Sequence, residues 1–126
     1  MNNKIANLYK NTETIKAPQT DNPRAMLITI FDELLSSINV FQSNIIPSSD
    51  TFRKKSSSFS KALTILYTLQ GSIDFEKDLG VAKSLFQIYE YTRVALIEEF
   101  KSCKIERSLK AVNALSEIRE SWSSID

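Results

Sequence analysis

The segment between residues 79 and 100 limits the possible folds more than any other part of the chain. Its apolar residues recur every three or four positions, which predicts a long amphipathic helix. The main apolar stripe consists of Ala82, Leu85, Tyr89, Leu96 and Phe100. Other apolar residues widen it on both sides, namely Val81, Ile88, Tyr91 and Ala95 on one and Phe86 and Ile97 on the other. An apolar arc this wide must be covered by more than one neighbour, either other helices of the domain or a partner.

Three further segments show helical periodicity. Asn22-Pro23 predicts a helix start, because Asn caps free amides and Pro suits the first helical position, and this helix should end before Pro47. A second helix is predicted from Phe59 to near Gly71, and a last one from Ile105 to Trp122. Their apolar stripes are Leu27, Phe31, Leu34, Ile38 and Phe41; then Phe59, Ala62, Leu63, Leu66, Leu69 and Ile73; and finally Ile105, Leu109, Val112, Leu115, Ile118 and Trp122.

Four amphipathic helices with short connections predict an all-α fold, an antiparallel four-helix bundle. We assign residues 22–126 to this bundle, a single domain, and residues 1–21 to a preceding extended or partly helical segment. The polar stretch 47–58 fits either a loop or an early helical turn. Its basic run, Arg53-Lys54-Lys55, could contact a phosphate or an acidic partner, but such short runs usually form solvated surface. At the third helix start, Asp78 and Leu79 lack the freedom of glycine, which predicts a helical or tightly turned junction.

Composition excludes several classes of protein. Sixteen basic and fifteen acidic residues leave a net charge of +1, which gives no case for binding nucleic acid or a membrane surface. The lone Cys103 cannot form an intramolecular disulfide, which fits a reducing compartment. No run approaches the ~20 apolar residues of a membrane span, and the start of the chain has no signal-peptide core. We therefore expect a cytoplasmic protein.

The sequence offers no residues suited to catalysis. Histidine is absent, which removes the commonest metal ligand and general base. Glu98 and Glu99 are adjacent on a predicted helix, so they point in different directions and cannot share a proton. No base lies beside the serine run at 56–58 to activate a nucleophile. We predict no enzymatic activity, no metal and no cofactor.

Binding through apolar helix surface is the remaining possibility. A compact bundle could consume all of this surface, or the surplus could form a groove for an amphipathic segment. The candidate groove residues are Ile65 and Leu69 of the second helix with Leu85, Ile88, Tyr89 and Tyr91 of the third. Leu69 and Leu85 could equally be core residues only. Residues 1–21 could be a frayed terminus, or a lid whose Ile5, Leu8 and Tyr9 lie on apolar surface until displaced.

Several motifs, in order and spacing, resemble the FliS family of flagellar secretion chaperones. They are the Asn22-Pro23 opening that ends in Phe31-Asp32, Lys61-Ala62-x-x-Ile65, Asp74-Phe75-Glu76-Lys77, Leu85-x-x-x-Tyr89-x-Tyr91, and the closing segment from Glu117 to Trp122. The chain departs from the family pattern at three places. Asp78-Leu79 replaces a Gly-Gly pair, Val94-Ala95 replaces an arginine pair, and Phe100 replaces an Asn, so the third helix is more apolar here.

The resemblance implies a four-helix bundle that binds the disordered carboxy-terminal segment of flagellin in the cytosol and prevents its premature polymerisation. The client would gain helix on binding. The family's amino-terminal segment covers part of the groove through a tyrosine that Tyr9 matches. One alternative is a regulatory module of the same fold that sequesters another flagellar protein, such as the anti-sigma factor. Another is a structural bundle that dimerises. Whether the chain is a monomer or a helix-swapped dimer stays open.

Overall fold

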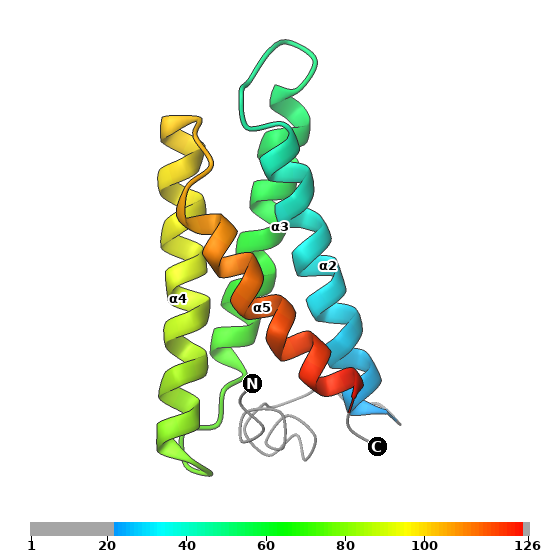
Figure 1. Cartoon of the computed structure of the whole chain (residues 1–126), viewed down its shortest axis with the longest axis vertical. Coiled ribbons are helices and arrows are strands. Elements are labelled where there is room, and N and C mark those ends of the chain that lie inside the picture. Colours follow the sequence, from blue (N-terminus) through cyan, green and yellow to red (C-terminus); the bar gives the residue numbers. More distant parts are fainter. Residues whose placement is uncertain (1–21, 125–126) are drawn as a thin grey trace.

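A computed structural model describes residues 22–124, which form four helices: α2 (Pro23–Ser43), α3 (Phe52–Gly71), α4 (Leu79–Ser102) and α5 (Arg107–Ser123). Helices α2, α3 and α4 run side by side in alternating directions, and α5 crosses in front of them from the end of α4 towards the start of α2 (Figure 1). Each helix packs on the next one in the chain, and α5 also packs on α2. The predicted all-α bundle is confirmed.

Local capping explains where α2 and α4 begin. The Asn22 side chain accepts a hydrogen bond from the Ala25 amide at 3.0 Å, and Pro23 occupies the first helical position. The Asp78 side chain accepts one from the Val81 amide at 3.1 Å. Both carboxamide and carboxylate oxygens satisfy amides that a helix start leaves free. The helix starts predicted at Pro23 and near Leu79 are confirmed.

The core lies between all four helices, and aromatic residues fill its centre. The Phe31 ring packs edge-on against Tyr89 and Trp122, with centroids 6.4 and 5.6 Å away. Such edge-to-face pairs add about 0.5–1.5 kcal/mol beyond area burial. The main buried apolar residues match the predicted stripes of the first three helices: Leu27, Phe31, Leu34, Ile38, Phe41, Ala62, Leu66, Leu69, Ile73, Ala82, Leu85, Tyr89 and Leu96.

Of the two alternatives for the polar stretch 47–58, the structure shows the early helical turn, whereas the inward face predicted for the start of the last helix was wrong. Helix α3 starts at Phe52, seven residues before the apolar periodicity begins, because the buried residues of its first turns are Lys55 and Ser58. In the last predicted stripe, Ile105 precedes the helix and is 37% exposed, and Leu109 is 57% exposed. Their inward positions are taken by Ser108 and Ala111, which are buried.

The connection between α3 and α4 is tightly turned, as predicted. The Glu76 amide donates a hydrogen bond to the Asp74 carboxylate at 2.9 Å, and Asp78 is extended with φ −148°. Within residues 22–124, Cys103 is the one non-glycine residue with positive φ. Since this connection requires no left-handed residue, Asp78 and Leu79 fit it without strain.

Helix α2 is long and apolar enough to cross a membrane by length and composition, and no other helix in the described part of the chain passes that test. One third of the tested window is buried within the bundle. Its Leu27, Phe31, Leu34, Ile38 and Phe41 side chains form part of the core. Because core helices of bundles pass the same test, the packing of α2 accounts for its apolar character.

Candidate client-binding surface

A buried carboxylate fixes the start of α5 on the end of α4. Glu99 is only 3% exposed, although its neighbour Glu98 lies on the surface. Its side chain accepts hydrogen bonds from the Glu106 amide (3.0 Å), the Ser108 amide (2.7 Å) and the Ser108 hydroxyl (2.5 Å). These amides belong to the free donors of a helix start, where a negative charge is favourable. The Gln42 side chain also donates to the Ser108 hydroxyl at 2.8 Å, which ties α2 to the same point.

A buried ammonium group closes the end of α4. Lys55 was expected on solvated surface, and this was wrong, because the side chain is 1% exposed. Its Nζ donates to the Phe100 carbonyl at 2.9 Å and to Cys103 Sγ at 3.3 Å, and lies 4.7 Å from the centroid of the Phe100 ring. The end of a helix has free carbonyls and partial negative charge, so a cation is well placed there. Both residues continue the helical spacing of the buried stripes, since Lys55 is seven residues before Ala62 and Glu99 is three after Leu96, but their charge predicted exposure.

This anchoring leaves apolar residues of α5 outside the core, along its border with α2. Ile105, Leu109 and Val112 recur at helical spacing. Seven residues beyond Val112 on the same side, Arg119 donates to the Asp32 carboxylate of α2 at 2.8 Å. Because this ion pair crosses from α5 to α2, Val112 also lies on the α2 side of α5, with Leu109 one turn before it and Ile105 just ahead of the helix.

Leu35 lies on the facing side of α2. It stands three residues after Asp32 and seven before Gln42, and both of these bond to α5. Leu35 and Val112 are partly buried and pack against the core, whereas Ile105 and Leu109 are exposed. We call Leu35, Ile105, Leu109 and Val112 the α5 strip. The prediction that Ile105 and Leu109 are core residues is wrong, whereas Val112 packs against the core as predicted.

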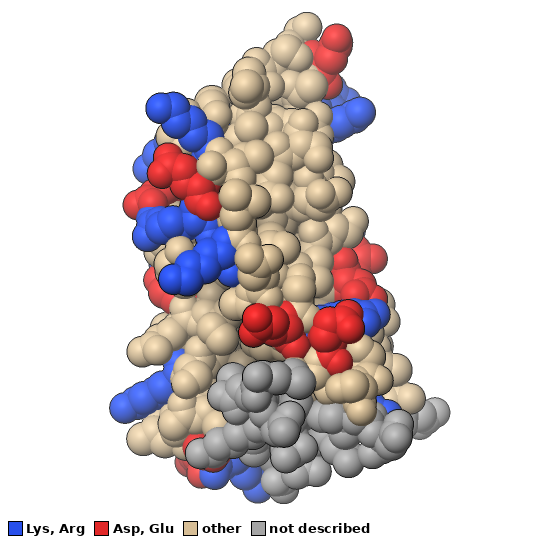
Figure 2. Space-filling model, in the orientation of Figure 1, with Lys and Arg blue, Asp and Glu red and all other residues tan. Residues whose placement is uncertain are grey.

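The face of the molecule that contains α5 has an uncharged centre. Figure 2 shows charged side chains along both edges of the upper half of this face, while its middle carries none. In Figure 1 this middle part overlies α2 and the upper part of α3, beside the first turns of α5. An uncharged zone with exposed apolar side chains and charged edges is typical of a protein interaction site.

The six predicted groove residues do not form one surface. Leu69, Leu85 and Tyr89 are buried in the core at 2%, 0% and 0% exposure. The placement of Tyr89 at a groove edge is therefore wrong in this structure. Burial raises the pKa of its phenol well above the ordinary value, so the hydroxyl stays neutral. Leu69 and Leu85 match the alternative in which they are structural only.

The other three lie on opposite sides of the bundle. Tyr91 is stacked with Arg107 of α5, whose guanidinium carbon lies 5.6 Å from its ring centroid, and Ile88 is one turn before Tyr91 on α4. Both therefore lie on the α5 side of α4 and are half-buried. Ile65 is one turn after Lys61, which pairs with Glu33 of α2 at 2.5 Å. Ile65 is thus on the α2 side of α3, away from Ile88.

The predicted lid residues Ile5, Leu8 and Tyr9 lie outside the described residues.

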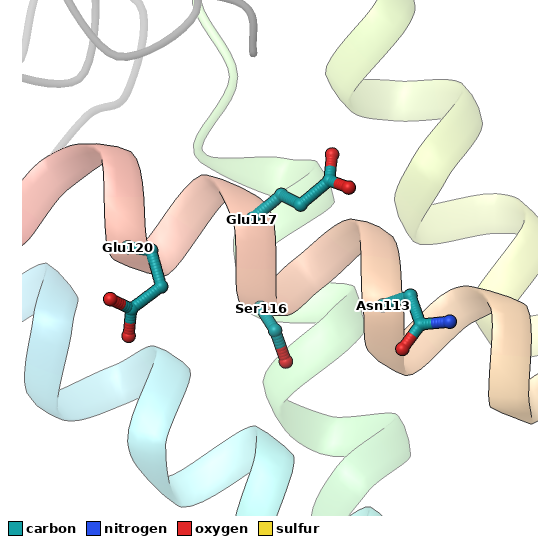
Figure 3. A pocket seen from close by; sticks show the side chains of 4 residues that line it. All are labelled: Asn113, Ser116, Glu117 and Glu120. Atoms are coloured by element: carbon teal, nitrogen blue, oxygen red, sulfur yellow. The ribbon is translucent and has the colours of Figure 1, made fainter.

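A hollow on the outer side of α5 has a different character. It is lined by Asn113, Ser116, Glu117 and Glu120, all of them polar (Figure 3). Glu120 points towards α2 and Glu117 points away from it, so the two carboxylates do not converge. Within the described part of the chain, no group of three or more His, Cys, Asp and Glu side chains could hold a metal ion. The hollow thus offers no metal-ligand set.

Comparison with known proteins identifies one family. The family model described as "Flagellar protein FliS" matches residues 1–126, the whole chain. No curated protein and no solved structure matches.

Proposed function

Because this chain belongs to the FliS family, it is a flagellar export chaperone in general terms, and we propose that its client is the carboxy-terminal segment of flagellin. The family is a chaperone family and is not one of enzymes, which supports the absence of catalysis. We place the interaction in the cytoplasm, where it would cover the segment that drives filament assembly and keep the subunit ready for export.

The observation that carries this proposal is the α5 strip. A disordered client that gains helix on binding needs apolar residues at helical spacing on its host. Ile105 and Leu109 offer such residues in the open, 37% and 57% exposed. Ile88 and Tyr91 lie on the other side of α5, and we include them as the part of the predicted groove that a client could reach. Ile65 could be reached only from the opposite side of the bundle.

Calorimetric titration of the full chain with a flagellin carboxy-terminal segment, combined with circular dichroism, tests the proposal. One-to-one binding with a negative heat-capacity change and added helix is the expected result. Absence of both heat and added helix would contradict it. In that case the same titration with the anti-sigma factor, and sedimentation of the chain alone, would examine the two alternative functions.

A separate variant tests whether α4 contributes to the client-binding surface. Ile88→Asp places a charge on a half-buried position beside α5, so client affinity should fall at least tenfold, which corresponds to about 1.4 kcal/mol. Circular dichroism must first show that the variant is folded. A folded Ile88→Asp protein that binds flagellin with unchanged affinity would remove the α4 side from the site.

The amino-terminal segment enters the proposal as a lid. If residues around Ile5, Leu8 and Tyr9 cover the client surface 99% of the time, client binding is weakened about 100-fold, or roughly 2.7 kcal/mol. Deleting residues 2–17 should therefore tighten binding by up to that factor. Equal or weaker affinity in calorimetry would exclude a lid.

A further inference from the structure

A second groove lies on the other side of the bundle, between α2 and the first half of α3. It is lined by Ser36, Ser37, Val40, Arg53, Lys54, Ser57, Ser58 and Lys61. Four of these are serines, whose small side chains leave room between the two helices. Three are cations and none is an acid. The groove is therefore lined by small hydroxyl side chains and edged by three cations.

The first turn of α3 supplies no negative charge to balance the cations of this groove. That turn carries Arg53 and Lys54 and no acidic residue, and the cap residue Thr51 makes no side-chain hydrogen bond to it. Cations at a helix start oppose the helix dipole, so this arrangement is unfavourable in the isolated chain. Lys61, two turns further along, already pairs with Glu33 of α2.

Apolar side chains lie beside the cations of the groove. Val40 lines the groove and is 37% exposed. Phe52, at the start of α3, is 52% exposed and borders a neighbouring hollow together with Arg53 and Ser57. A ligand for this surface would need negative charges and a few apolar contacts, in an elongated shape that follows the two helices.

We propose that the α2–α3 groove binds an acidic, helix-forming segment of a partner protein. Lys54 and Lys61 are seven residues apart, which is two helical turns or about 10.5 Å along α3, and Lys61 would exchange its exposed pairing with Glu33 for a carboxylate of the partner. A partner helix with acidic residues at positions i and i+7 matches this spacing, and its intervening apolar residue would contact Val40. Charge complementarity of this kind sets the partner's identity and its association rate more than the raw affinity.

The groove is independent of the flagellin proposal. Ile88 and Tyr91 lie beside α5 and Leu109 lies on it, whereas the groove lies on the side of α2 that faces α3. A segment bound there would leave the α5 strip open, so failure of one proposal does not entail failure of the other.

Fluorescence anisotropy with two synthetic peptides tests the inference. The probe is an 18-residue amphipathic peptide with Glu at i and i+7 on either side of a leucine stripe, and its control carries Lys at the same positions. The full chain should bind the Glu peptide and not the Lys peptide, and the affinity should fall with added salt. Equal binding of both peptides, or no binding of either, would overturn the proposal.

Variants distinguish peptide binding in the groove from attraction to the net charge of the protein. The double variant Arg53→Glu, Lys54→Glu should bind the Glu peptide at least tenfold more weakly. The control is Lys104→Glu with Lys110→Glu, which changes the net charge by the same amount at exposed sites and should have little effect on peptide affinity. Ser57→Trp should also abolish binding by filling the groove with its cations kept, and Ser84→Trp on α4 is its control. Equal losses in the two charge variants, or full binding by Ser57→Trp, would contradict the assignment. Self-association that disappears in the Arg53 and Lys54 variant would assign the groove to a second copy of the chain instead.

Discussion

The two connections of α4 are built in different ways. At its start, the bonds join near neighbours: Glu76 to Asp74 at 2.9 Å and Val81 to Asp78 at 3.1 Å. At its end, they join distant parts of the chain, since Lys55 of α3 bonds to Phe100 and Glu99 bonds to the start of α5. The first connection lies at the bottom of Figure 1 and the second at the top.

This difference shows which connection positions the candidate site. Local hydrogen bonds shape a turn without fixing a helix against its neighbours. The bonds of Glu99 and Gln42 fix the start of α5 on α4 and α2, and those of Lys55 join α3 to the end of α4, because they cross between these helices. The exposure of Ile105 and Leu109 follows from this fixed position. Removing the hydrogen bonds at the end of α4 should therefore lower the stability of the bundle more than changes at its start.

The largest effect is expected from Glu99→Ala. It leaves the Glu106 amide, the Ser108 amide and the Ser108 hydroxyl without their acceptor, and should lower the free energy of unfolding by about 3 kcal/mol. Urea unfolding measures this change. The neighbouring Glu98→Ala is the matched control, since Glu98 pairs with Arg107 on the surface and its loss should cost at most about 0.5 kcal/mol. Equal losses in both variants would show that the buried carboxylate does not anchor α5.

The next effect should come from Lys55→Met. The change keeps the aliphatic stem but removes the donor to the Phe100 carbonyl, and should cost about 2 kcal/mol of unfolding free energy. Lys54→Met, one position away and exposed, should stay within about 0.5 kcal/mol of the wild type. Urea unfolding of both proteins decides the matter, and a larger loss in the Lys54 variant would refute the role of Lys55.

A smaller effect is expected at the other connection. Phe75 is 41% exposed and its ring lies 6.1 Å from that of Phe86. Phe75→Ala should therefore cost only about 1 kcal/mol, with Phe52→Ala as an exposed-phenylalanine control near zero. Thermal unfolding of both variants compares them. If Phe75→Ala lowered the free energy of unfolding as much as Glu99→Ala, the two connections would not differ in their contribution to stability.

The smallest effect depends on pH and concerns the pairing of α3 with α4. Hydrogen bonds from Arg93, and then from Gln70, lower the pKa of Glu90 from 4.5 to about 2. Because the pKa is lower in the folded state, the stabilisation is complete above pH 4.5 and is lost as the pH falls towards 2. Glu90→Gln should be less stable than wild type by about 0.5 kcal/mol at pH 7, given the partial exposure. The difference should vanish near pH 2 in urea unfolding, and a difference that persists there would exclude this origin.

The contrast between the connections also explains what could be predicted from the sequence. The starts of α2 and α4 could be predicted, because Asn22-Pro23 and the periodicity after Asp78 are local signals. The burial of Lys55 and Glu99 could not, because their partners lie 45 and 9 residues away along the chain. Local patterns gave no sign of these partners, so both residues resembled ordinary surface charges.

The same limit applies to the candidate site. Ile88 and Tyr91 were identified as candidates from the excess apolar surface of α4, and they do reach the surface beside α5. The apolar pattern predicts Leu109 in the core. Ser108 is polar, so the pattern did not indicate that Ser108 would be the residue that points inward. A serine is buried at that position because Glu99 and Gln42 satisfy its hydroxyl.

The most direct test of the account is a calorimetric titration of a flagellin carboxy-terminal segment into three proteins: the wild type, Leu109→Asp and Asn113→Asp. Both substitutions add one negative charge to exposed positions on α5, four residues apart, so the folded bundle should tolerate them equally. Leu109→Asp should weaken binding at least tenfold, while Asn113→Asp should bind like the wild type. Wild-type affinity for the Leu109→Asp protein would contradict the claim that the anchored α5 presents the client surface.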